Sequence, residues 1–207
     1  MSPNGAAAAA DPAVRRLTPK GRATRQRIVD GAAAEIRIRG AVATTLEDVM
    51  AHTATSKSQL FHYFPGGKDQ LLLDVAELEA ARVLGDQQPH LGQLVSWAAW
   101  QRWRDAVVER YRQEGQLCPL STVMSEIVRT PGAQAVTTTL IDRWRSEIEV
   151  GVRAMQAQGK IDAAVDPARA AAALLAGIQG GVLVLMSTGD IGYLEAALDV
   201  GIAALRG

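Results

Sequence analysis

The sequence has little that could cross-link the chain or carry catalysis. Its 207 residues include one cysteine and three histidines. The lone cysteine, Cys118, excludes an intrachain disulfide and fits a reducing cytosol, where we expect it to be a packed thiol. The histidines at 52, 62 and 90 lack metal-ligand spacing, and no HExxH, paired-cysteine motif, GxSxG or phosphate-cradling glycine loop occurs. We therefore expect no enzyme activity, no cofactor and no metal site.

Strand signals and long apolar runs are also scarce. No alternating run of β-branched residues stands out, whereas alanine and leucine are abundant, so we predict an almost entirely helical chain. The most apolar stretch, Ala170 to Met186, contains Gln179 and three glycines and suits a packed helix better than a membrane span. The N-terminal MSPNGAAAAADPAVRR lacks the features of a secretory signal, which predicts a disordered basic arm over residues 1–17 and a cytoplasmic location.

Charge is unevenly distributed although the net charge is zero. Residues 1–70 carry ten Lys and Arg against six Asp and Glu, whereas residues 71–207 carry twelve against sixteen. A basic front and an acidic rear indicate a polyanion partner for one end of the chain only. The basic excess is densest from Arg15 to Arg27, which suits phosphate contacts better than a merely solvated face.

The segment from Thr45 to Lys68 contains two short helical patterns around a tight connection. A threonine near position 45 would cap the first helix, and Thr55 or Ser56 would cap the second, which Pro65 ends. A generic helical hairpin would show the same apolar spacing, so the basic surroundings decide in favour of DNA. The outward side chains of the second helix, which can bond base edges and phosphates, are Lys57, Ser58, Gln59 and His62.

A stretch within roughly residues 20–75 resembles the helix-turn-helix signature of the TetR family of bacterial transcription regulators. Its sequence is LEDVMAHTATSKSQLFHYFPGGKDQL. FHYFPGGK is most similar to the LmrA/YxaF-like branch, in which a double glycine precedes the lysine, and Cys118-Pro119-Leu120 is similar to a segment of those proteins. The resemblance implies an all-α, nine-helix fold. It would comprise a three-helix DNA-binding domain over residues 18–67 and a six-helix ligand-binding and dimerisation domain over residues 68–207.

The resemblance also implies which residues contact DNA. The second helix of the motif would enter the major groove, and Lys68 would anchor a phosphate at the start of the next helix. Phe61 lacks the hydroxyl of a tyrosine that is frequent there, which leaves Tyr63 as the substitute. The predicted DNA-binding set is Arg22, Arg25, Thr45, Thr55, Ser56, Lys57, Ser58, Gln59, His62, Tyr63 and Lys68.

Proline and glycine punctuation divides the rest of the chain into six predicted helices. Their approximate ranges are 68–87, 91–114, 119–128, 131–158, 167–188 and 193–205. The second of these holds three of the four tryptophans along one helical stripe. An ordinary aromatic core seam would explain this pattern, but the equivalent helix of TetR-like proteins lines a ligand cavity. The predicted apolar pocket for a flat or hydrophobic effector comprises Trp97, Trp100, Trp103, Val107, Tyr111, Leu120, Met124, Trp144, Ile148, Met155 and, as a polar anchor, Gln179.

The last two helical patterns predict a homodimer. The helix from Pro167 is apolar nearly all round and rich in small residues, and the last helix offers an apolar stripe beside it. A fully internal helix in a monomer is the alternative. The predicted four-helix interface comprises Ala173, Ala176, Gly177, Gly180, Val184, Leu194, Leu198 and Ile202. A symmetric pair of reading helices predicts a palindromic double-stranded operator.

These features together predict a ligand-responsive DNA-binding transcriptional regulator. We expect a repressor that leaves its operator when the effector shifts the middle helices and changes the distance between the two reading helices. An activator of the same fold would share every one of these features. A helical small-molecule binding protein without DNA function would share the pocket and the interface, and DNA binding separates it from the other two.

Overall fold

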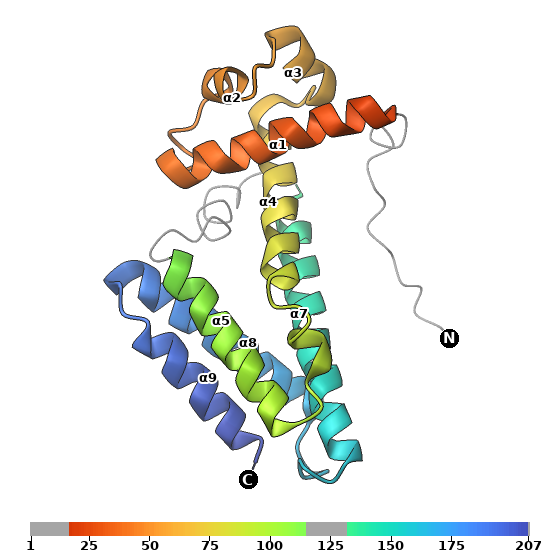
Figure 1. Cartoon of the computed structure of the whole chain (residues 1–207), viewed down its shortest axis with the longest axis vertical. Coiled ribbons are helices and arrows are strands. Elements are labelled where there is room, and N and C mark those ends of the chain that lie inside the picture. Colours follow the sequence, from red (N-terminus) through yellow and green to blue (C-terminus); the bar gives the residue numbers. More distant parts are fainter. Residues whose placement is uncertain (1–16, 115–131, 207) are drawn as a thin grey trace. The chain divides into compact units, whose positions relative to one another are not determined.

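The structure is a computed structural model that describes residues 17–114 and 132–206. Within these ranges it contains eight α-helices, one short 3-10 helix and no strand (Figure 1). The all-α prediction is confirmed, whereas the count of nine helices is not. The N-terminal arm up to residue 16, the predicted helix 119–128 and the predicted pocket residues Leu120 and Met124 lie outside the described residues. The helices are α1 (Pro19–Arg39), α2 (Leu46–His52), α3 (Lys57–Tyr63), α4 (Gly67–Gly85), η2 (Leu91–Gln93), α5 (Trp97–Glu114), α7 (Ala133–Ala157), α8 (Pro167–Thr188) and α9 (Gly192–Ala204).

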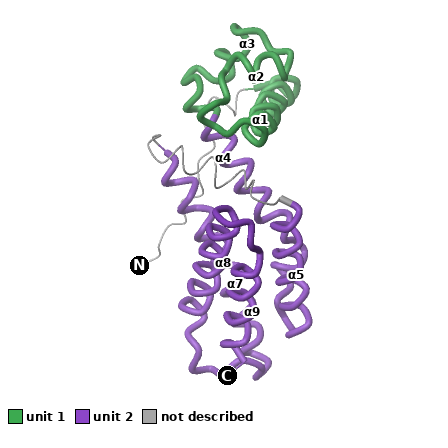
Figure 2. Tube along the Cα trace, turned by 90° about the vertical axis from the view of Figure 1, so that its left-hand side faces the viewer, with its two compact units in different colours: residues 1–71 green, residues 72–207 purple. Residues whose placement is uncertain are grey.

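The chain divides into two compact units, residues 1–71 and 72–207, which we call unit 1 and unit 2 (Figure 2). Unit 1 holds α1 to α3 and the first residues of α4, and unit 2 holds the rest of α4 and the helices that follow it.

Unit 1 is a three-helix arrangement around a small apolar core. Thr18 caps α1 by accepting a hydrogen bond from the Gly21 N–H at 3.1 Å, and Pro19 occupies the first turn. α1 passes close to the end of α2 at Gly31, where an added Cβ would lie 2.2 Å from Thr53 Cγ2. Glycine therefore permits this helix contact. The buried apolar side chains are Ile28, Val29, Ala32, Ala33, Ile36, Ala41, Val49, Leu60, Phe64 and Leu71.

Unit 2 is built around α8, which packs against both α7 and α9. An added Cβ on Gly181 would lie 2.6 Å from Leu194 Cα, and one on Gly201 would lie 2.4 Å from Leu174 Cδ2. Small residues thus bring α8 and α9 together within one protomer. By length and composition alone α8 would suffice for a membrane span. Its buried residues belong to the core cluster of unit 2, so it is a core helix.

The predicted helix 91–114 is wrong at its start, because α5 begins only at Trp97. Leu94 leaves the helical region with a ψ of 55°, which ends the 3-10 turn η2. Ser96 Oγ then accepts a hydrogen bond from the Ala99 N–H at 3.2 Å and starts a new helix. α7 likewise begins at Ala133, just after Gly132 with its φ of +94°. The start of α5 was not visible in the apolar periodicity, which continues through Leu94 and Val95, whereas the start of α7 lies within two residues of the predicted one.

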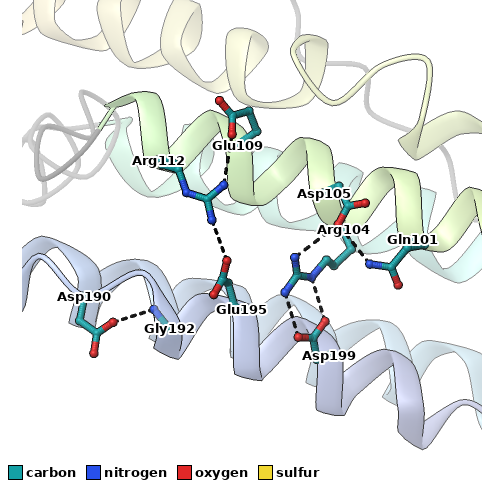
Figure 3. A network of polar contacts seen from close by, with 9 residues as sticks. All are labelled: Gln101, Arg104, Asp105, Glu109, Arg112, Asp190, Gly192, Glu195 and Asp199. Atoms are coloured by element: carbon teal, nitrogen blue, oxygen red, sulfur yellow. Dashed lines mark hydrogen bonds and ion pairs between the residues drawn. The ribbon is translucent and has the colours of Figure 1, made fainter.

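Two ion pairs join α5 to α9 on the surface of unit 2 (Figure 3). Arg104 donates to both carboxylate oxygens of Asp199 at 2.8 Å, and Arg112 donates to Glu195 at 2.8 Å. The hydrogen bonds to Asp199 raise the pKa of Arg104. These contacts fix the register of α5 along α9.

Candidate nucleic-acid interface and effector region

The helix α3 has one buried and one exposed side. Leu60 and the C-cap residue Phe64 are fully buried. A capping box fixes its start: Ser56 Oγ accepts from the Gln59 N–H at 3.2 Å, and Gln59 Oε1 accepts from the Ser56 N–H at 3.2 Å. The predicted base-facing residues Lys57, Ser58, Gln59 and His62 are all exposed. Tyr63 is half-buried and meets the His62 ring edge-on at 4.9 Å.

Thr55 does not have the exposure that a DNA contact requires, which corrects its prediction. Its side chain is buried, and its Oγ1 accepts a hydrogen bond from Thr53 Oγ1 at 2.8 Å. The Thr53 hydroxyl has a single hydrogen, which it can donate either to Thr55 Oγ1 or to the Val49 carbonyl. Ala54 between them has a φ of +46°, where glycine is usually favoured. The two buried hydroxyls therefore belong to the turn that sets α3 against α2.

Three of the predicted DNA-binding cations, Arg22, Arg25 and Lys68, already contact the protein. Arg22 donates to the Leu17 carbonyl at 2.7 Å, and the Arg25 guanidinium lies 5.1 Å from the centre of the Phe64 ring. Lys68 Nζ donates to the Val42 carbonyl at 3.2 Å, which joins the start of α4 to the loop after α1. Because an ammonium has three donors, this bond leaves Lys68 capacity for a phosphate.

The hydroxyl of Thr45 is committed within its own capping box. It donates to Asp48 Oδ2 at 2.7 Å and accepts from the Asp48 N–H at 3.1 Å. The bonds that the Thr45 hydroxyl and the Thr45 backbone N–H donate to Asp48 Oδ2, and then the charge of Arg39, lower the pKa of Asp48, so its carboxylate is charged at neutral pH. A phosphate would have to approach Thr45 against that charge. The geometry therefore favours a capping role for Thr45 over the predicted phosphate contact.

The predicted effector residues of α5 and α7 lie together in the core cluster of unit 2. The fully buried members are Trp100, Trp103, Val107, Trp144, Ile148 and Met155, and Tyr111 is nearly so. Trp100 and Trp103 meet edge to face, with ring centres 5.7 Å apart. Trp97 is only partly buried and lies under the guanidinium of Arg206, 4.7 Å from the ring centre.

Gln179 is exposed on α8, so the predicted polar anchor does not face this cluster. The buried amide is Gln87, just beyond α4: its Oε1 accepts from Trp103 Nε1 at 2.9 Å, and its Nε2 donates to the Val83 carbonyl at 2.8 Å. The sequence could have predicted that Gln87 is buried. It follows the buried residues Ala80 and Val83 by seven and four positions, which places all three on one helical face.

The predicted dimer residues fall into two groups. Leu194, Leu198 and Ile202 are buried within the protomer, so their assignment to an intersubunit surface is corrected. Ala173, Ala176 and Gly180 are exposed, and Gly177 and Val184 are half-buried. Exposed apolar side chains nearby on the same two helices include Leu183, Tyr193 and Val200, at 66%, 56% and 69%.

A hollow of about 700 Å³ lies on unit 1 and is not the predicted effector pocket. It is open to solvent and is lined by Ala23, Gln26, Arg27, Asp30, Gly31, His52, Thr53 and Ala54. Among the described residues, no group of three or more His, Cys, Asp or Glu is placed to hold a metal ion.

The capped α3, crossing next to α2 through a tight turn, defines unit 1 as a helix-turn-helix domain. Residues 28–75 match the family described as bacterial regulatory proteins, tetR family, and residues 97–200 match the tetracyclin repressor-like C-terminal domain. The chain belongs to the TetR family, whose members are DNA-binding regulators and not enzymes.

Known proteins resemble the chain in sequence and in fold. An uncharacterized HTH-type transcriptional regulator of Mycobacterium tuberculosis is 32% identical over 135 residues, which cover 58% of this chain and 64% of that protein. The chain thus spans slightly under two thirds of the curated relatives it matches. A TetR regulator of Chloroflexus aurantiacus has 27% identity and a TM-score of 0.74, covering 90% of this chain and 96% of its own. SmeT, the repressor of the Stenotrophomonas maltophilia multidrug efflux pump SmeDEF, has 20% identity and a TM-score of 0.67, covering 90% and 92%.

Proposed function

We propose that this protein is a ligand-responsive transcriptional repressor that reads DNA with α3. The observation that carries the proposal is the exposed row Lys57, Ser58 and Gln59 on a short helix whose opposite side is fully buried at Leu60. Amide, hydroxyl and ammonium groups at these positions suit base edges and phosphates in a major groove. The Gln59 carboxamide oxygen also caps α3, so its Nε2 is the group left for a base.

The proposed functional unit is a homodimer on a palindromic operator. α8 presents Ala176, Gly180 and Leu183 at a helical spacing of four and three, and α9 presents Tyr193 and Val200 seven apart, all exposed in the protomer. Small and apolar residues on two adjacent helices suit a second copy of the same two helices. Two reading helices would then contact half-sites about 34–36 Å apart.

The proposed effector is a small, flat, hydrophobic molecule bound among the aromatic residues of α5 and α7. The chain shares its fold with SmeT, and the structure of the SmeT–triclosan complex is 19% identical to it in sequence. α4 contains residues of both units, so a change in unit 2 has a continuous helix through which to alter the spacing of the two reading helices. A coupling of about 1–3 kcal/mol would change operator affinity about 5- to 150-fold.

Two finer assignments complete the proposal. Gly66 and Gly67 before Lys68, with Gly67 at a φ of +65°, support the LmrA/YxaF-like branch. A cytoplasmic location follows from the proposed DNA target.

In vitro selection from random duplex DNA, followed by mobility shifts on the selected site, tests the DNA-reading role. We expect an inverted repeat to be enriched. Lys68→Ala should weaken binding to all sequences and lower the salt slope by about one unit, whereas Gln59→Ala should change base preference. Lys160→Ala, an exposed cation of unit 2, is the matched control and should change neither. Absence of any enriched duplex at low ionic strength would refute the proposal, and an enriched site without inverted symmetry would refute its dimeric form.

A further inference from the structure

Two of the three fully buried tryptophans of unit 2 have unpaired indole groups. Trp100 Nε1 and Trp144 Nε1 are buried and have no hydrogen-bond partner in the described part of the chain. Trp103 differs, since its Nε1 donates to Gln87 Oε1 at 2.9 Å. The same residue type in the same core cluster is therefore satisfied at one position and unsatisfied at two others.

Buried donors without acceptors are unusual and unfavourable. Most buried side-chain polar atoms in folded proteins have a partner, and an unpaired donor costs the free energy of its lost hydration. What the Trp100 ring has is its edge-to-face contact with Trp103, which is weaker than an N–H···O bond. Phenylalanine would fill most of the same space without an N–H. Two unpaired donors buried inside an apolar cluster would suit a site for an acceptor-bearing molecule.

We infer that the effector carries at least one neutral hydrogen-bond acceptor, such as a carbonyl oxygen, which the indole N–H of Trp100 or Trp144 binds. This inference rests on the proposed effector site and specifies its chemistry. The cluster around the two indoles is made of aliphatic and aromatic side chains, where a charged acceptor would lose its hydration. Trp103 takes no part, because Gln87 already occupies its N–H. Binding requires the side chains that now cover the two N–H groups to move apart.

Matched pairs of ring compounds that differ only in a carbonyl test the inference on the full-length protein. Suitable pairs are fluorene with fluorenone, xanthene with xanthone, and diphenylmethane with benzophenone. Dissociation constants come from tryptophan fluorescence, and the protein carries ¹⁵N-labelled tryptophan so that each indole N–H gives a separate NMR signal, assigned with single Trp→Phe variants. We expect the ketones to bind about 2- to 10-fold more tightly than the hydrocarbons, the gain of one neutral hydrogen bond. The Trp100 or Trp144 signal should move downfield with the ketone only, while the Trp103 signal keeps its position.

The outcomes separate this inference from the proposed function. Equal affinity within every pair, with unmoved Trp100 and Trp144 signals, overturns the acceptor inference and leaves an apolar effector site intact. Binding of ketones that shifts only the Trp103 signal also overturns it. If no member of any pair binds, both the acceptor and the proposed effector site fail, whereas the DNA-reading role is judged by its own selection experiment. The affinity comparison within each pair uses the unaltered protein, so this part of the test does not depend on whether a tryptophan variant folds.

Discussion

At the scale of single residues, the hydrogen-bond state of a side chain decides its role more than its type does. Gln59 and Gln87 are both amides, yet the first is exposed and caps α3, whereas the second is buried between α4 and Trp103. Thr45 and Thr55 were both predicted to touch DNA, and both hydroxyls are engaged within the fold. The residues left for recognition are those whose polar atoms remain at the surface.

The Trp103–Gln87 bond should be visible in stability. Trp103→Phe removes the donor and leaves Gln87 Oε1 buried without it, whereas Trp100→Phe removes a donor that has no partner. We expect Trp103→Phe to lower the free energy of unfolding by about 1–3 kcal/mol more than Trp100→Phe. Urea denaturation followed by far-UV circular dichroism measures both variants. The two rings are equally buried, so equal losses would show that the bond contributes nothing.

At the scale of elements, the short helices of unit 1 depend on their caps. α2 and α3 have seven residues each, fewer than an isolated helix needs, and both start with a reciprocal capping box. The cap of each helix was predicted from the sequence, because a cap and the N–H it accepts from are about three residues apart, but the part that Gln59 plays in the box of α3 was not. The start of α5 was not predicted, because Ser96 follows apolar residues that continue the same periodicity.

The cap of α2 predicts a pH dependence. The Thr45 hydrogen bonds lower the folded-state pKa of Asp48 below its ordinary value, so the charged carboxylate stabilises the fold above the ordinary aspartate pKa. This contribution is lost as the pH falls from there through the lowered folded-state pKa. We expect the difference in melting temperature between wild type and Asp48→Asn to be largest near neutral pH and to shrink in acid. A difference that stays constant from pH 7 to pH 3 would contradict the role of the charge. Asp69→Asn, an exposed carboxylate in the first turn of α4, is the control.

At the scale of the whole molecule, α8 and α9 each have two apolar faces. Their inner faces meet through Gly181 and Gly201 inside the protomer, and their outer faces are left apolar. The sequence predicted that these helices need cover on several sides. It assigned Leu194, Leu198 and Ile202 to the intersubunit face, whereas they lie on the face buried within the protomer. Both faces of each helix are apolar, so the pattern alone cannot tell which face meets the neighbouring helix and which is left for the proposed contact with a second copy.

The outer face predicts a variant that separates the subunits without unfolding them. Leu183 is 66% exposed in the protomer, so Leu183→Glu should not destabilise the fold of a single protomer. It should, however, place a charge in the proposed interface. We expect light scattering to show dissociation at micromolar concentration, together with loss of operator binding. Val150→Glu on α7, a residue 62% exposed, is the matched control and should remain dimeric. A dimeric Leu183→Glu protein with full operator affinity would rule this face out.

The sequence by itself determined the features that depend on neighbours within one helical turn. These are the helical composition, the caps of α2 and α3, and the exposed row from Lys57 to Gln59, because capping and periodicity act over three or four residues. Only the tertiary structure decided which surface each apolar stripe meets. It turned Gln179 outward, brought Gln87 to Trp103 and left the N–H groups of Trp100 and Trp144 unpaired, since such contacts join residues far apart in the chain.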